Sequence, residues 1–463
     1  MNFSSLIFIF LYLPLVLGIY YITPRKFRNA LLLLANLVFY GWGEPVFVLV
    51  MAASIVSNYI FGLLIEKHRD NKRLEKTFVL FALIISFGLL GAFKYAGFFS
   101  ELLASIPLFS AMPKINIPLP IGISFYTFQA ASYIIDIYRG DTKAQKSIIN
   151  FGTYISFFPQ LIAGPIVRYR DIEGRLDNRR ENIHDFADGV RLFAVGLSKK
   201  VLIANQMGML FDALRAQNCG VIGAWVGITS YAFQIYFDFS GYSDMACGLG
   251  KMFGFEFMRN FDYPYISKSI TEFWRRWHIS LSTWFRDYVY IPLGGNRRKI
   301  PRVIFNLFVV WALTGLWHGA SVNFLMWGIY YFVILVLEKY VYGKYLGKLP
   351  SVLQHIYAVL LILIGWVIFY FEECSELLAY MTNMFTFSSG ILDAASASVI
   401  VSYLPLIAVT VFACTPIAKN VWAKFKDRKI TAVIETAAVL VALMLCTAAL
   451  VSQSYNPFLY FRF

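Results

Sequence analysis

The sequence predicts an all-α protein that crosses a membrane many times, and composition, hydropathy and the spacing of apolar runs carry this prediction. The chain of 463 residues is 59% hydrophobic and 15% charged, whereas a soluble domain carries about a quarter charged residues. Its mean hydropathy is +0.61. Apolar runs of about twenty residues, enough for a helix to span a bilayer, recur along the chain.

The apolar runs define the expected elements in order. The clearest runs are Phe3–Ile22, Val46–Ile65, Thr77–Phe99, Val190–Phe211, Val352–Phe371 and Ile430–Val451. Less continuous runs are Ala30–Tyr40, Ile117–Ile137, Ile148–Val167, Val221–Phe239, Val303–His318, Val322–Leu337 and Ser396–Phe412. The first run lacks a basic start and a small-residue cleavage site, so we expect a helix and not a signal peptide. In all we expect roughly ten to thirteen membrane helices, some of them short or re-entrant.

No internal repeat, low-complexity segment or long linker interrupts these runs. We therefore expect one membrane domain over residues 1–463, with a motif-bearing core at 1–340 and C-terminal helices at 341–463. The five cysteines show no CxxC pair or metal-ligand spacing and lie mostly in apolar stretches. We expect buried thiols and no metal site.

The net charge of +14 does not indicate nucleic-acid binding, because the basic residues gather in short loops between apolar runs. The main clusters are Arg25–Arg28, Lys67–Lys76 and Lys419–Lys429. Cytoplasmic loops of membrane proteins are rich in Lys and Arg. With these clusters in the cytoplasm, the acidic turn Glu372–Glu376 and both termini fall outside.

The segment Phe157–Pro165 is apolar but contains two prolines and a glycine, and basic residues flank it on both sides. A simple crossing would put one basic flank on the wrong side of the membrane. Irregular backbone is tolerated at membrane depth where it lines a protein-enclosed cavity, so we expect a re-entrant loop. Its residues of interest are Pro159, Gln160, Gly164 and Pro165. A kinked ordinary helix is the alternative.

The stretch of residues 259–302 is rich in arginine and tryptophan. Wound as one helix, Glu272–Tyr288 has an apolar stripe beside a polar one. The apolar stripe is Trp274, Trp277, Leu281, Trp284, Phe285 and Tyr288, and the polar stripe is Arg275, His278, Ser282 and Arg286. Such a helix lines a half-polar cavity, or anchors the chain at the membrane surface without chemistry. The turn Gly294–Arg298 offers amides and arginines to phosphates, although most such turns are only turns.

His318 is the strongest single candidate for a catalytic residue. It lies between apolar helical stretches, where ionisable groups are costly and usually face a cavity or perform a function. A neutral imidazole is the least costly of these groups and takes up a proton near neutral pH. The small neighbours Gly315, Gly319 and Ala320 allow a second backbone or a substrate to approach closely. A structural histidine that hydrogen-bonds a neighbouring helix is the alternative.

Acidic residues beside another apolar run add to this set. Asp238, Tyr242 and Asp244 lie within Phe237–Asp244. They are placed to orient an imidazole or to pair with the arginines of the polar stripe. An ion pair that only ties helices together is an equal alternative.

The chain resembles the membrane-bound O-acyltransferases, in particular the bacterial alginate O-acetyltransferase branch. The motifs that carry this resemblance are Pro118–Gln129, Phe158–Pro165, Phe237–Asp244, Phe273–Asn296 and Leu316–Ala320. They occur in the family's order over roughly residues 1–340, and the ending Asn456–Phe461 is also similar. The resemblance implies a ring of tilted helices around a tunnel that opens to both faces of the bacterial inner membrane.

The resemblance also implies roles for individual residues. His318 matches the family's catalytic histidine, and His278 matches its second polar catalytic position. As base or transient acetyl carrier, His318 would serve attack of a hydroxyl on a thioester. Residues expected to bind the donor or to line the tunnel are Trp274, Arg275, Arg276, Trp277, Ser282, Arg286, Asn296, Arg297, Trp317, Asp238, Tyr242 and Asp244.

The function implied by this resemblance is acetyl transfer from a cytoplasmic donor, acetyl-CoA or another acyl thioester, with no permanently bound cofactor. The acetyl group would pass to an extracytoplasmic partner with a serine-hydrolase-like site, which O-acetylates a polysaccharide such as alginate. Alternatives are D-alanyl transfer to teichoic acid, peptidoglycan O-acetylation, and a non-enzymatic lipid or solute transporter.

Overall fold

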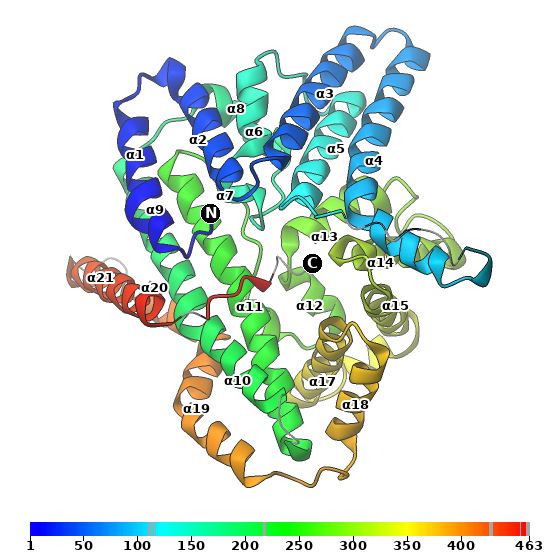
Figure 1. The fold of residues 1–463 in the computed structure, drawn as a ribbon, viewed down its shortest axis with the longest axis vertical. Helices are drawn as coiled ribbons and strands as arrows, with labels where there is room; N and C mark the ends of the chain where they lie inside the picture. Colours follow the sequence, from blue (N-terminus) through cyan, green and yellow to red (C-terminus); the bar gives the residue numbers. More distant parts are fainter. Residues whose placement is uncertain are drawn as a thin grey trace. The chain divides into compact units, whose positions relative to one another are not determined.

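The computed structural model describes residues 1–109, 113, 115, 117–215, 219–425, 429–453 and 455–459. The described residues form helices and no strand, which confirms the predicted all-α class (Figure 1). Among them, seven helices are long and apolar enough to cross a membrane, and a shorter apolar helix covers Phe8–Ile22. The seven are Phe47–Lys67, Lys72–Ala104, Ile300–His318, Val322–Leu346, Ser351–Tyr370, Ala394–Ala413 and Ile430–Ser452. The chain is therefore a multi-pass membrane protein. Within the expected motifs and clusters, Lys426, Arg428, Tyr460 and Phe461 lie outside the described residues.

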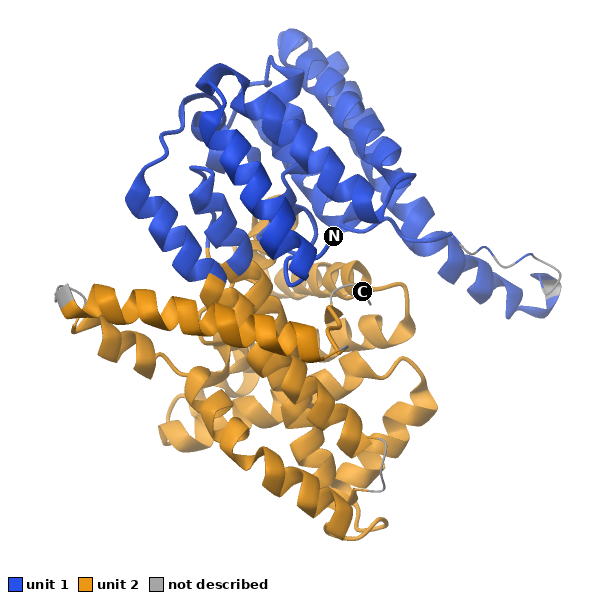
Figure 2. Ribbon diagram, turned by 60° about the vertical axis from the view of Figure 1, so that its left-hand side comes forward, with its two compact units in different colours: residues 1–193, 245–258 blue, residues 194–244, 259–463 orange. Residues whose placement is uncertain are grey.

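The chain divides into two compact units (Figure 2). Unit 1 comprises residues 1–193 and 245–258, and unit 2 comprises residues 194–244 and 259–463. The helices of unit 1 are η1 (Phe8–Tyr12), α1 (Leu13–Ile22), η2 (Arg25–Phe27), α2 (Arg28–Gly43), α3 (Phe47–Lys67), α4 (Lys72–Ala104), η3 (Pro107–Phe109), α5 (Ile123–Arg139), α6 (Ile148–Ser156), α7 (Phe158–Leu161) and α8 (Tyr169–Asn178). Two helices enter both units, α9 (Ile183–Ser198) and α11 (Gly220–Met252). The expectation of one domain stays a prediction.

Unit 2 contains the remaining helices. These are η4 (Lys199–Ala204), α10 (Asn205–Arg215), η5 (Pro264–Ile266), α12 (Ile270–Arg276), α13 (Ile279–Phe285), η6 (Arg286–Tyr290), α14 (Ile300–His318), α15 (Val322–Leu337), η7 (Glu338–Tyr342), α16 (Gly343–Leu346), α17 (Ser351–Tyr370), α18 (Cys374–Phe385), α19 (Ala394–Ala413), α20 (Ile417–Ala423) and α21 (Lys429–Ser452). Helix α15 packs against both α14 and α17, and α12 contacts α15 and α17.

In unit 1, α3, α4 and α5 lie side by side (Figure 1). Side chains of 14 of the 17 residues in α5 are buried, so protein and not lipid surrounds most of this helix. Asn71 caps the start of α4 by accepting a hydrogen bond from the Leu74 amide, which satisfies one of the free N–H groups of a helix start.

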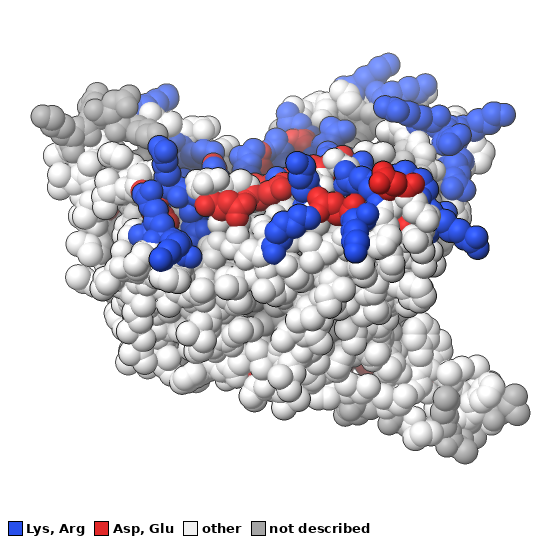
Figure 3. Space-filling model, turned by 90° about the horizontal axis from the view of Figure 1, so that it is seen from above, with Lys and Arg blue, Asp and Glu red and all other residues white. Residues whose placement is uncertain are grey.

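Polar contacts bring the basic loops of unit 1 to one end of its helices. Arg28, at the start of α2, pairs with Glu181 at 2.7 Å. Arg69, after α3, donates to the Ile137 carbonyl at the end of α5. Figure 3 shows lysines and arginines crowded together with acidic residues, beside a broad uncharged surface. This separation of charge is the one expected of a protein whose apolar sides face lipid.

The broken apolar segment of unit 1 enters and leaves at this same basic end. Helix α6 starts next to Lys146, which pairs with Glu66, and the return ends near Arg170, which pairs with Asp141. Between them α7 is only four residues long, and Phe158 and Gln160 are fully buried. The re-entrant loop stays a prediction.

One expected span of unit 2 carries charge in its middle. Val190–Phe211 reads as an apolar run, but the structure places a π-helical turn at Lys199–Ala204 within it. Lys200 is 3% exposed and pairs with the equally buried Asp238 at 2.7 Å. A buried ion pair of this kind lets a lysine lie inside a helical bundle without contacting lipid.

Candidate functional site

The residues around His278 do not form the single helix predicted from the sequence. Helix α12 ends at Arg276, and His278 adopts a left-handed conformation with φ 45° before α13 begins. The Asp262 amide donates to the Arg276 carbonyl and the Ile279 amide donates to the Asn260 carbonyl. These bonds to a neighbouring loop replace those of a continuous helix, so the prediction of one helix over Glu272–Tyr288 is wrong.

Asn260 fixes the orientation of the His278 ring. Its Oδ1 accepts hydrogen bonds from the Ser280 amide at 3.1 Å and from the Ser280 hydroxyl at 2.9 Å. Because an amide N–H can only donate, this atom is an acceptor, and His278 Nδ1, 3.2 Å away, must carry the proton. In the neutral ring Nε2 is then the basic nitrogen. His278 is 2% exposed, and no described residue forms a hydrogen bond with its Nε2.

His318 is the last residue of α14, and small residues bring α15 close to it. A Cβ placed on Gly315 would collide with the Phe324 carbonyl, and one on Gly319 would collide with the Phe324 ring. His318 is 8% exposed, and its ring lies 5.0 Å from that of Trp327.

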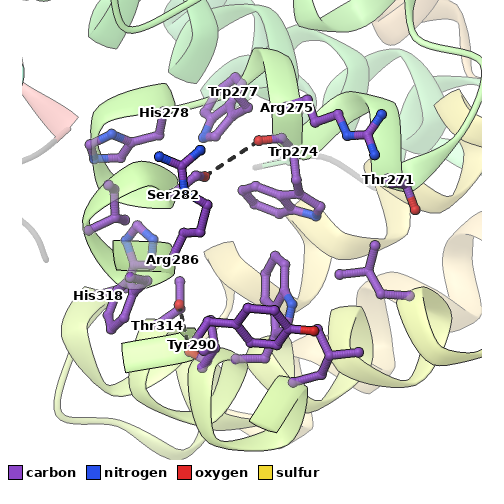
Figure 4. Close-up of a pocket in the computed structure, with 16 residues that line it drawn as sticks. Thr271, Trp274, Arg275, Trp277, His278, Ser282, Arg286, Tyr290, Thr314 and His318 are labelled. Atoms are coloured by element: carbon purple, nitrogen blue, oxygen red, sulfur yellow. Dashed lines mark hydrogen bonds between the residues drawn. The ribbon is translucent and has the colours of Figure 1, made fainter. Parts of the chain in front are cut away.

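The two histidines line one cavity of about 240 Å³ in unit 2 (Figure 4). Figure 4 shows His278 and His318 at one end of this cavity and Arg275 and Thr271 at the other. The Trp317 ring lies 5.7 Å from the ring of His278 and 5.0 Å from that of His318. Predicted residues that line this histidine cavity are Trp274, Arg275, Trp277, His278, Ser282, Arg286 and His318.

Tryptophan and tyrosine rings build much of the wall. The Trp274 ring lies 4.8 Å from Trp311 and 4.8 Å from Tyr331, both on the helix pair α14–α15. The wall of the histidine cavity is therefore largely aromatic and apolar.

A second, larger cavity of about 740 Å³ shares part of this wall. Arg275, Thr271 and Tyr290 line both cavities. Lys268, Lys339, Asn296, Glu272 and Glu338 line the larger one only, so its wall is more polar than that of the histidine cavity. We call it the polar vestibule.

A third cavity, of about 20 Å³, has His318, Asp238 and Leu459 among its lining residues. It has room for a single water molecule. The Leu459 amide donates to Asp238 Oδ2 at 2.9 Å, which attaches the end of the described chain to α11. His318 thus lines two cavities.

Several predicted residues lie elsewhere. Arg276 pairs with Glu272 at 2.9 Å, and Arg297 is exposed and lines neither the histidine cavity nor the polar vestibule. Asp244 pairs with Lys199 at 2.6 Å. The two acids of α11 therefore pair with lysines of η4 and not with the arginines of the polar stripe.

Tyr242 and the residues of the broken segment do not line the histidine cavity either. The Tyr242 ring packs 4.8 Å from Phe458. Pro159, Gln160, Gly164 and Pro165 all lie in unit 1, where Gln160 Nε2 donates to the Tyr154 carbonyl at 2.6 Å.

The sequence reasoning missed Asn260 and Lys200. Opposite charges within two apolar runs were the available signal for the pair of Lys200 with Asp238. Nothing in the local sequence marks Asn260, because its role comes from a contact across 18 positions of the chain.

Fold and site together define an integral membrane protein with two buried histidines in one cavity. The model of the membrane-bound O-acyltransferase family matches residues 142–371. A probable alginate O-acetylase, AlgI of Azotobacter vinelandii, is 40% identical over the whole of both chains. A peptidoglycan O-acetyltransferase of Helicobacter pylori is 33% identical over 82% of this chain and 79% of its own. A teichoic acid D-alanyltransferase of Bacillus subtilis is 29% identical over 52% of this chain and 64% of its own.

The chain belongs to the membrane-bound O-acyltransferase family. It is an O-acyltransferase, as the motifs of the sequence predicted, and not the non-enzymatic transporter that the sequence alone left open.

Proposed function

We propose that this protein takes an acetyl group from acetyl-CoA and passes it across the membrane for O-acetylation of a polysaccharide such as alginate. The observation that carries this proposal is the shared cavity of His278 and His318. The full-length similarity to an alginate O-acetylase supports the acetyl group and the kind of acceptor. The teichoic acid relative covers only half of this chain, so D-alanyl transfer is less favoured.

The polar vestibule is the proposed entry for the donor. Coenzyme A carries its phosphates at one end and its thioester at the other, and basic side chains bind phosphates. Lys268 and Lys339 line the vestibule, and Arg275 lies where vestibule and histidine cavity meet. A donor bound with its phosphates there would extend its thioester towards the histidines.

His318 is the proposed base of the transfer. An acceptor hydroxyl gives its proton to the imidazole as its oxygen bonds to the thioester carbonyl carbon. The carbon–sulfur bond then breaks, and the imidazolium returns the proton to the departing thiolate. In a variant of this route the imidazole nitrogen first takes the acetyl group and releases the thiol, and the hydroxyl attacks afterwards.

His278 has a different proposed part. Because its Nδ1 proton faces Asn260, its Nε2 accepts a proton or a hydrogen bond. This suits a group that orients the acceptor hydroxyl, whereas stabilising an oxyanion would require a hydrogen-bond donor. The Trp317 ring packs against both imidazole rings.

The orientation we propose follows the charges around α17. Lys344 and Lys348 precede this helix and Glu372 follows it, so the vestibule end is cytoplasmic and Cys374 is extracytoplasmic. Both termini are then extracytoplasmic, in the inner membrane of a bacterium. The acetyl group would leave on that side to a partner with a serine-hydrolase-like site.

Acetyl transfer from labelled acetyl-CoA to a soluble hydroxyl acceptor tests the proposal on the purified protein. We expect His318→Ala to lower the rate about 100-fold or more, because a positioned base contributes this much. His355→Ala is the matched control, since this histidine of unit 2 bonds the Ser267 carbonyl and lines neither cavity. Wild-type rates for His318→Ala would disprove the role. Transfer only from a carrier-protein thioester would disprove acetyl-CoA as donor.

A further inference from the structure

A polar cavity of about 510 Å³ lies in unit 1, within the size range of ligand pockets. It is formed by η2, the start of α2 and the segment that follows α8. Five basic residues line it, namely Arg25, Lys26, Arg28, Arg179 and Arg180. Neither His278 nor His318 belongs to this unit, so the transfer site does not explain this cavity.

The charges of the cavity do not cancel. Its acidic residues are Asp177 and Glu181, which leaves an excess of three positive charges over the five basic residues. Glu181 forms ion pairs with Arg28 at 2.7 Å and with Arg179 at 3.6 Å. Among the described residues, no carboxylate forms an ion pair with Arg25, Lys26 or Arg180. An anion is the ligand that this balance attracts.

The guanidinium of Arg179 is a fixed positive charge in the wall of the cavity. Its side chain is 6% exposed, and its guanidinium donates from Nε to the Tyr20 hydroxyl at 2.8 Å and from Nη1 to Asn29 Oδ1 at 2.6 Å. The same group stacks on the Phe255 ring at 4.7 Å. Its Nη2 is buried and has no hydrogen-bond partner among the described residues. The contacts with Tyr20, Asn29 and Phe255 therefore hold the positive charge of Arg179 in the cavity wall.

Apolar side chains lie next to the basic ones. Ile22 ends α1 and is 85% exposed, and Phe27, in η2, is 53% exposed with the Lys26 ammonium over its ring. Leu34, further along α2, is 61% exposed. A basic pocket between apolar helices is the arrangement that binds the headgroup of an anionic lipid, whose acyl chains then follow the helices.

We propose that this cavity binds a phosphate-bearing anion, and that its source is the headgroup of an anionic phospholipid. The phosphate would accept from Arg25, Lys26 and Arg180, the exposed basic residues of the cavity. This site is separate from the acyl-transfer site and does not depend on the proposed function.

The test uses the full chain, purified in detergent and reconstituted into vesicles of phosphatidylcholine with or without phosphatidylglycerol. Native mass spectrometry then counts the phospholipid that stays bound after extraction. The cavity variant Arg25→Gln/Lys26→Gln/Arg180→Gln removes three exposed charges, none of which forms an ion pair among the described residues. We expect the wild type to retain phosphatidylglycerol over phosphatidylcholine, and the cavity variant to retain about tenfold less.

The matched control removes three exposed charges of the same unit that do not line the cavity, Lys67, Arg73 and Lys76, each changed to Gln. We expect it to retain phosphatidylglycerol as the wild type does. Equal retention by the cavity variant and the control overturns the proposal. A separate arm adds inorganic phosphate to delipidated protein and follows thermal unfolding. If phosphatidylglycerol is not retained but phosphate stabilises the wild type and the control, and not the cavity variant, the phosphate site is supported. Its ligand is then a soluble phosphate and not a lipid headgroup.

Discussion

At the scale of single residues, Asn260 decides which nitrogen of His278 can accept a proton. Its Oδ1 takes hydrogen bonds from His278 Nδ1 and from Ser280. In Asn260→Ala the ring is released, and we expect kcat to fall about 10- to 100-fold with little change in KM, as for residues that orient a functional imidazole. Acetyl-transfer kinetics measure both parameters.

Asn260→Asp separates orientation from folding. The carboxylate keeps the acceptor oxygen, so most of kcat should return, and its charge favours the protonated ring. The acid limb of the pH profile of kcat should then move to higher pH. Asn58→Ala is the control, because this buried asparagine of unit 1 bonds only Ser54 and Ser86. A similar loss of kcat in Asn58→Ala would show that loss of any buried amide explains the effect.

At the scale of elements, Glu181 connects three segments of unit 1. It accepts from the Tyr20 hydroxyl of α1, pairs with Arg28 of α2, and lies beside Arg179. Burial raises the pKa of the Glu181 carboxyl, but the hydrogen bonds from Tyr20 and Arg28 outweigh burial, so the pKa lies below its ordinary value. The carboxylate form therefore stabilises the junction of these segments.

The pH dependence of this contribution follows from the sign of the shift. A lowered pKa in the folded chain adds stability above the unfolded pKa of about 4.3, and that stability is lost as pH falls through the folded pKa. At neutral pH, Glu181→Gln should lower the unfolding free energy by about 2 kcal/mol, the size of a hydrogen bond to a charged group. Thermal unfolding in detergent should show this difference shrinking below about pH 4. An unchanged difference at acid pH would contradict the assignment, and Glu376→Gln, at an exposed position of α18, controls for lost charge alone.

The elements also show where sequence patterns stop being informative. The stripes of Trp274, Trp277 and Leu281 predicted one helix, and their side chains do line or adjoin one cavity. The break at His278 has no glycine or proline to mark it, because hydrogen bonds from residues 260–262 impose it. Periodicity reports which face is buried, but it does not report a tertiary bond that ends a helix.

At the scale of the whole molecule, composition predicted the membrane class because hydropathy sums over the chain and needs no long-range contact. The ordered motifs predicted the family, since several long matches in sequence are specific where each alone is weak. Neither predicted two compact units, nor that Lys199 and Lys200 of a long apolar run would pair with acids of α11. Such pairings depend on which helices meet, and local sequence does not encode this.

The proposed orientation of the whole chain is tested through its cysteines. Cys374 is exposed at the start of α18, and the other four cysteines are buried. If the acidic turn beside Cys374 is extracytoplasmic, a membrane-impermeant maleimide should label this thiol in intact cells from which the outer membrane has been removed. A second variant, Lys76→Cys in a Cys374→Ser background, places a thiol at an exposed position in the basic first part of α4. We expect this thiol to be labelled only after the membrane is permeabilised. The opposite pattern would invert the chain and place the polar vestibule, which lies at the lysine-rich start of α17, on the extracytoplasmic side. Acetyl-CoA, which is made in the cytoplasm, would then have no direct path to His318, so this labelling decides both the orientation and the direction of transfer.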